Sequence, residues 1–137
     1  MKRAFCGMAL LGLLGCAPLR TETPCPAPSQ QPMVVTEMFF GRDIPGRQPL
    51  TDREWSDFAT AAIAREFPNG FTVTDGEGQW QNPQTHVVAH ERAIILLAAS
   101  VHMDGLAGRI SRISDAYRTK FHQASVGVIT YNACGAF

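Results

Sequence analysis

The spacing of apolar and polar residues predicts a strand followed by a helix. Residues 34–41 (VVTEMFFG) are β-branched and aromatic, which is typical of a strand, and a Pro-Gly pair then breaks the chain. Residues 51–54 (TDRE) form a capping box, with Leu50 and Trp55 placed as a hydrophobic staple, so a helix is expected to begin there. Apolar side chains recur at helical spacing until residues 68–70 (PNG) end the element.

The pattern predicts further strands and a second helix. The expected elements are a strand at 71–74, a tight turn at 75–78 (DGEG), a strand through 79–81 that turns at 82–83, a strand at 93–99, a helix from about 106, and a last strand at 125–130. In the second helix the buried stripe is expected at Leu106, Ile110, Ile113, Tyr117 and Phe121. The order β-α-β-β-α-β predicts an α+β, ferredoxin-like fold: an antiparallel sheet with both helices on one face.

The strand at 93–99 (AIILLAA) is apolar at both alternating sets of positions. A strand buried on both sides has this pattern, so the sheet face without helices needs a cover. Three covers are available: the ribbon at 75–90, the C-terminal tail beside Cys134, or a second copy packed sheet to sheet. We expect the ribbon to cover this face and keep dimerisation as the alternative.

The N-terminal residues have the pattern of an export signal. Lys2 and Arg3 precede an uncharged apolar run over 4–14, which is shorter than the roughly 20 residues of a membrane-spanning helix. The run ends in Leu13-Leu14-Gly15-Cys16, which resembles the lipobox of bacterial lipoproteins, where the cysteine receives lipid and becomes the new N-terminus. We expect residues 1–15 to be a signal peptide and Cys16 to be lipidated; the alternatives are an ordinary signal peptide cut near Ala17 or an uncleaved anchor.

The residues after Cys16 predict a location and a spacer. In lipoproteins of double-membrane bacteria an aspartate after the lipidated cysteine commonly marks inner-membrane retention, and Ala17 stands here. The resemblance therefore implies a lipid-anchored protein of the bacterial envelope, on the outer membrane and facing the periplasm, with the bilayer as a partner through Cys16. Residues 16–33 hold five of the nine prolines, which predicts an extended tether before a domain at 34–137.

The four cysteines of the chain have separate predicted fates. Cys6 leaves with the signal peptide and Cys16 takes the lipid, so Cys25 and Cys134 remain. Two cysteines in an oxidising compartment usually form a disulfide. A redox or metal-binding thiol pair is the alternative, and the absence of CxxC spacing weighs against it.

Charge and motifs exclude several functional classes. Twelve basic residues balance 12 acidic ones, and 45% of the residues are hydrophobic, so neither a nucleic-acid binder nor a disordered chain is expected. The chain has no GxSxG, HExxH, P-loop or GxGxxG motif, and we expect no cofactor. His86 and His90 lie about 13 Å apart on an extended segment, so no metal site is expected.

Several short motifs together resemble a family of small secreted bacterial proteins, mostly lipoproteins, classified as a conserved domain of unknown function. The motifs are Thr36-Glu37 with Phe40-Gly41, Trp55, Phe67-Pro68 with Gly70, Thr72 and Asp75, Gly78-Gln79-Trp80, and Tyr117, Phe121, Gln123, Ser125 and Val126. The match runs from about residue 34 to the end. The resemblance implies an envelope location and an α+β fold, and it supplies no reaction or ligand. Ala124 stands where an acidic residue is expected, which removes a carboxylate from any shared polar site.

One candidate polar site follows from these motifs and the expected topology. Its members are Glu37, Trp80, Glu91, Tyr117, Gln123 and Ser125. Neighbouring strands would bring them together, and a carboxylate among apolar neighbours suits acid–base work. The favoured alternative is a structural network in which a glutamate pairs with Arg42, Arg92 or Arg118.

The leading hypothesis is therefore a non-enzymatic, membrane-anchored lipoprotein. Its domain would bind another envelope component, and an envelope protein or a second copy is the expected partner. The lipobox, the tether and the lack of a catalytic signature support this hypothesis. The alternative is a small-molecule-binding or enzymatic domain that uses the polar site.

Overall fold

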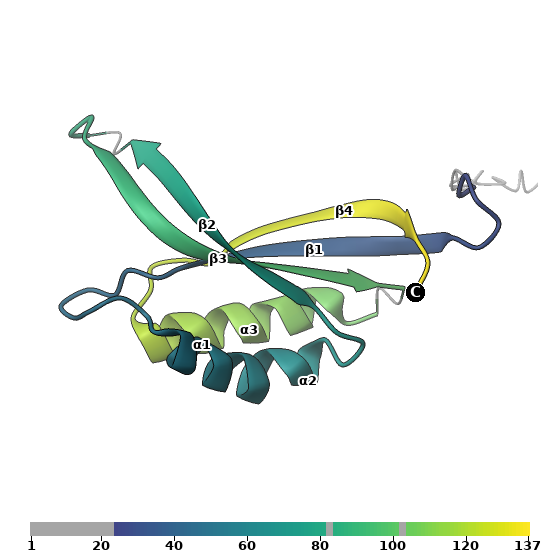
Figure 1. The fold of residues 1–137 in the computed structure, drawn as a ribbon, viewed down its shortest axis with the longest axis horizontal. Coiled ribbons are helices and arrows are strands. Elements are labelled where there is room, and N and C mark those ends of the chain that lie inside the picture. The colour runs from purple at the N-terminus through teal and green to yellow at the C-terminus, as the bar shows by residue number, and fades with distance from the viewer. Residues whose placement is uncertain (1–23, 82–83, 102–103) are drawn as a thin grey trace, which may run out of the picture.

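Four antiparallel strands form one sheet, and all helical segments lie on one of its faces (Figure 1). The computed structural model describes residues 24–81, 84–101 and 104–137. Along the chain the elements are β1 (Gln31–Gly41), α1 (Asp52–Phe58), the π-helix η1 (Ala59–Ile63), α2 (Ala64–Glu66), β2 (Thr72–Gln81), β3 (Val88–Ser100), α3 (Leu106–Phe121) and β4 (Gly127–Gly135). The strand order in space is β2-β3-β1-β4. The predicted ferredoxin-like fold is confirmed.

The first helical rod begins where the capping box predicts. The Glu54 backbone N–H donates to the Thr51 hydroxyl at 3.3 Å, and the Thr51 backbone N–H donates to the Glu54 carboxylate at 2.9 Å. A hydrogen bond from Arg47, followed by those from Thr51, lowers the pKa of Glu54 to about 2. The segments α1, η1 and α2 follow one another without a break, and the rod ends at Glu66, just before the predicted stop.

Aromatic rings fill the space between the helices and the sheet. The Phe40 ring centroid lies 4.8 Å from that of Tyr117 and 5.1 Å from that of Trp55. Edge-on and tilted packing at such distances stabilises aromatic pairs beyond their burial. In α3 the predicted stripe is confirmed, because its members are buried or packed against the core. The helix face of the sheet is therefore sealed by the chain itself.

β1 and β4 are longer than the pattern predicts at the end where the chain enters the domain. β1 begins at Gln31, and Pro32 lies opposite Cys134 in β4. The predicted disulfide between Cys25 and Cys134 is confirmed. It holds the segment around Cys25 against the end of β4.

The tight turn predicted at 75–78 is wrong, because β2 runs straight through it. Gly76 lies opposite Ala93, and a Cβ there would come within 2.8 Å of the Ile95 Cδ1 atom. The glycine thus allows close packing across the strand pair rather than a turn. The turn predicted at 82–83 lies outside the described residues.

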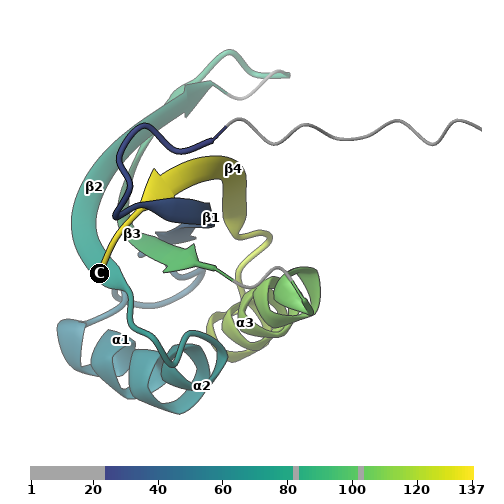
Figure 2. The same ribbon diagram turned by 90° about the vertical axis from the view of Figure 1, so that its right-hand side faces the viewer.

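The ribbon does not cover the second face of the sheet, so this expectation is also wrong. β1 pairs with β3 only as far as Gly41 and Ala93, and beyond that point residues 77–81 pair with 88–92 alone. We call these two paired segments the arm. The arm continues the sheet and rises away from the helices (Figures 1 and 2).

Among the described residues, no helix is long and apolar enough to cross a membrane.

Candidate functional site

The sheet face opposite the helices has no cover in the described chain, and we call it the open face. Strand alternation and cross-strand register place the same set of positions on it across β1, β3 and β4. Its main side chains are Val35, Glu37, Phe39, Ile95, Leu97, Ile129 and Tyr131. This exposed and largely apolar surface is therefore the first candidate for a functional site on the domain.

Some large side chains of the open face lie flat across glycines of the neighbouring strand. The pairs are Phe39 over Gly127, Met33 over Gly135 and Ile95 over Gly76, and a Cβ on each glycine would lie within 3.2 Å of its partner's side chain. An aromatic or apolar side chain shields the bare glycine backbone in such pairs. These pairs place apolar side chains over the bare glycine backbone of the open face.

Other apolar side chains on the open face remain in contact with water. Leu97 keeps 42% of its surface exposed, Ile129 52% and Tyr131 44%. Single exposed apolar residues are ordinary, but a contiguous group of them on one surface marks an interaction site.

The open face carries a single carboxylate among its described residues in the four-stranded region. The Tyr131 hydroxyl donates to the Glu37 carboxylate at 3.0 Å, across β1 and β4. This hydrogen bond raises the pKa of Tyr131, so the tyrosine stays protonated and keeps its donor role. The charge of Glu37 is therefore already partnered on an otherwise apolar surface.

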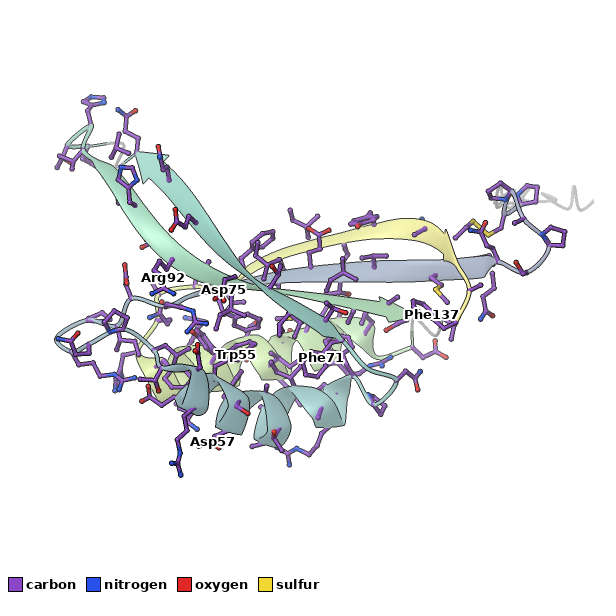
Figure 3. All side chains as sticks on the ribbon, in the orientation of Figure 1. Trp55, Asp57, Phe71, Asp75, Arg92 and Phe137 are labelled. Carbon is purple, nitrogen blue, oxygen red and sulfur yellow. A yellow bond between two sulfur atoms is a disulfide. The ribbon has the colours of Figure 1, made fainter. Side chains whose placement is uncertain are left out.

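A hollow of about 400 Å³ indents the open face at the end away from the arm. Its walls are mainly apolar, with a few amide and hydroxyl groups at the edge. The lining residues are Gln31, Met33, Asn69, Gly70, Phe71, Thr72, Leu97, Ala99, Val101 and Phe137. The volume and lining are in the range of small-molecule sites. Phe137 lies at this end of the molecule and is fully exposed (Figure 3).

The six residues of the predicted polar site do not form one cluster. Glu37 lies on the open face, whereas Tyr117 is sealed beneath the opposite face with no exposed surface. Glu91 is exposed on the arm, opposite Gly78, and Ser125 is exposed ahead of β4. The backbone of Trp80 lies in β2, and its side chain lies outside the part of the chain that is described.

Two of the predicted residues, Tyr117 and Gln123, both bond to the chain at the end of β1 and in the loop that follows it. The Tyr117 hydroxyl donates to the Gly41 carbonyl at 2.9 Å, and the Gln123 side-chain amide donates to the Asp43 carbonyl. Burial raises the pKa of Tyr117 to about 12. His122 ends α3 in a left-handed conformation, which turns the chain toward this loop. Both bonds end on backbone oxygens, which indicates a structural role.

The best-organised charged group, which we call the Arg42 cluster, is not among the sites predicted from the sequence. The buried Arg42 guanidinium lies 2.8 Å from the Asp75 carboxylate and 2.9 Å from that of Asp52, and it donates to the Leu50 carbonyl at 3.0 Å. Burial acts to lower the pKa of Arg42, but the hydrogen bonds with Asp75 and Asp52 outweigh it and raise the pKa. Arg42 thus pairs with aspartates rather than with the predicted glutamates.

The Arg42 cluster fixes the base of the arm. Asp75 lies on β2 one residue before Gly76, where the arm leaves the sheet, and Arg92 lies nearby on β3 (Figure 3). The Arg42 backbone N–H donates to the Arg92 carbonyl at 2.8 Å. Asp75 belongs to the motifs that carry the family resemblance. Because a turn was predicted at 75–78, the pairing of Asp75 with Arg42 was not predicted. Among the described residues, no three histidine, cysteine or acidic side chains gather in a way that would hold a metal ion.

The fold and the two unlike faces define a ferredoxin-like α+β domain with one apolar sheet face left open. The family described as protein of unknown function DUF3574 matches residues 35–137, and the chain belongs to it. No curated protein matches the sequence.

Two solved structures share the fold at low sequence identity. A phage SAM lyase in complex with S-methyl-5'-thioadenosine has a TM-score of 0.58 and 11% identity, over 77% of this chain and 90% of that one. CutA from Synechococcus elongatus has a TM-score of 0.51 and 10% identity, over 80% of this chain and 87% of that one. At such identities the similarity shows the fold alone.

Proposed function

We propose that this protein is a lipid-anchored component of the bacterial envelope, on the outer membrane facing the periplasm, that acts by binding through its open face. The single observation that carries the binding role is the apolar surface around Leu97, Ile129 and Tyr131, which the described chain leaves uncovered. A surface of this kind is unfavourable in water unless a partner covers it.

The lipobox ending at Cys16 supports the anchor, and the disulfide bears on its geometry. Because Cys25 is tied to the end of β4, the free tether between lipid and domain shrinks to residues 17–24. Eight residues of extended, proline-containing chain reach about 25 Å. The tether would therefore hold the open face and its hollow close to the membrane surface, within reach of other envelope components.

The enzymatic alternative loses its geometric support. Glu37 and Tyr117 lie on opposite faces of the sheet, and of the predicted polar residues whose side chains the structure describes, none lines the hollow. Small-molecule binding then depends on the hollow alone, which shares Leu97 with the open face. We therefore assign the hollow to the same binding surface.

Membrane fractionation of the full chain tests the anchor. Cys16→Ser removes the only thiol at the lipobox, so the protein is expected to move from the membrane fraction to the soluble periplasmic fraction. Cys6→Ser is the matched control, because it changes a cysteine within the predicted signal peptide and leaves the lipobox intact. Membrane association that persists in the Cys16→Ser protein would contradict the anchor.

A further inference from the structure

Within residues 24–81, 84–101 and 104–137, two parts lack a packing partner, and both belong to the same sheet. The open face exposes Leu97 and Ile129, and the arm is a two-stranded ribbon with Val88 48% exposed. An isolated two-stranded ribbon is only marginally stable in water. The arm therefore needs a surface to pack against, just as the open face needs a cover.

The sizes of these two surfaces match what an association between proteins requires. β1, β3 and β4 are paired over eight or nine residues and β2 adds five outside the arm, so strands about 4.8 Å apart give an open face on the order of 500 Å². One side of the arm adds on the order of 150 Å². Stable interfaces bury about 800 Å² on each partner, so the open face needs the arm to approach this size.

The shape and charge of the open face favour a protein over a bilayer. The arm rises from the edge of the sheet on the side away from the helices, so a flat membrane cannot lie against the face beside it (Figures 1 and 2). Glu37 would also carry its charge into the lipid, where a carboxylate is costly. In a protein interface, the Tyr131 hydroxyl already supplies one of the hydrogen bonds that the Glu37 carboxylate needs.

We propose that a second copy of this chain covers the open face, with the arm of one copy packed along the sheet of the other. The proposal rests on the proposed function, because it names the partner of the same surface. A second copy meets both needs at once, since every copy brings one uncovered face and one unsupported arm. Identical subunits form closed assemblies by such reciprocal contacts.

The test is the mass of the full chain, purified from membranes in detergent and measured by native mass spectrometry at micromolar concentration. We expect a defined oligomer. A monomer throughout the concentration series would overturn the proposal.

Three variants locate the contact. Ile129→Arg places a charge on the open face opposite Glu37, which the folded monomer tolerates, and Val88→Arg places one on the arm. Each is expected to weaken association by at least about 100-fold, because a large, hydrated guanidinium replaces an apolar contact and is costly to bury even beside a carboxylate. Ala116→Arg is the matched control, since it adds the same charge at an exposed position of α3 and should leave the mass unchanged.

The pattern of results separates the parts of the proposal. An oligomer that withstands Ile129→Arg uses another surface, and the proposal is then wrong. If Ile129→Arg yields monomers and Val88→Arg has no effect, the arm is not part of the contact. Circular dichroism confirms that each variant is folded. The anchor is tested separately by Cys16→Ser, so failure of either idea is distinguishable from failure of the other.

Discussion

Both faces of this sheet carry apolar side chains, but the helices cover only one of them. Phe39 and Phe40 are neighbours in β1 and point to opposite sides of the sheet, so the same type of side chain lies in two different environments. Phe40 lies among aromatic rings with no exposed surface, while Phe39 lies flat over Gly127 and stays half-buried. The helix face stabilises the fold, whereas the open face keeps apolar surface available for a partner.

The largest expected effect separates these two faces directly. Phe40→Ala should lower the free energy of unfolding by about 3–5 kcal/mol, because it leaves a cavity in the aromatic core. Phe39→Ala should cost only about 1 kcal/mol, because part of its ring remains in water in the single chain. Urea unfolding of both variants measures the difference, and equal costs would show that the two faces are buried alike.

An intermediate effect is expected at the junction between the sheet and the arm. Asp75→Asn weakens the pairing with the buried Arg42, which should cost about 1.5 kcal/mol once the exposure of Asp75 is taken into account. Glu77→Gln on the same strand is the control, and a change at this exposed position should stay within about 0.5 kcal/mol. Urea unfolding compares the two variants, and a cost for Asp75→Asn no greater than the control's would refute the role given to the Arg42 cluster.

The smallest effect concerns the hydroxyl of Tyr117. Tyr117→Phe removes the hydrogen bond to the Gly41 carbonyl and should cost about 1 kcal/mol at neutral pH. Because burial raises the pKa of Tyr117 to about 12, the unfolded chain loses this proton first. The stability from this group is full below pH 10 and is lost as the pH rises through about 12.

The measurement for Tyr117 is best made in a Tyr131→Phe background, because the chain has only two tyrosines and the pKa of Tyr131 is also raised. Ultraviolet absorbance then follows a single tyrosinate, and unfolding is measured at each pH. A Tyr117 that ionises near pH 10 in the folded protein would mean that the helix face is open to water.

Local signals explain which predictions the structure confirms. The capping box at Thr51 and the stripe on α3 depend on contacts within a few residues, and both are present. The pairing of Cys25 with Cys134 followed from elimination among four cysteines rather than from geometry. Where an interaction depends on which strands lie side by side, the predictions were wrong: the turn at 75–78 and the covering ribbon are two examples.

The candidate site shows the same limit. The residue types of Glu37 and Tyr117 attracted attention, but their positions on opposite sides of the sheet depend on the pleat and on the packing of α3. Arg42 was seen only as a partner for glutamates. Its aspartates lie 10 and 33 positions away in sequence, and only the folded loop and the β2–β3 pairing bring all three together.

The sequence by itself determined the order of the elements, the disulfide and the apolar character of both sides of the central strands, because these follow from local periodicity and residue chemistry. Only the tertiary structure decided that the helices cover one face and that the ribbon extends as an arm instead of folding over the other. The physical reason is that β2 and β3 stay paired beyond the end of β1, and Ile95 packs across Gly76 where the two strands leave the rest of the sheet. The local sequence pattern does not indicate how far a pair of strands continues.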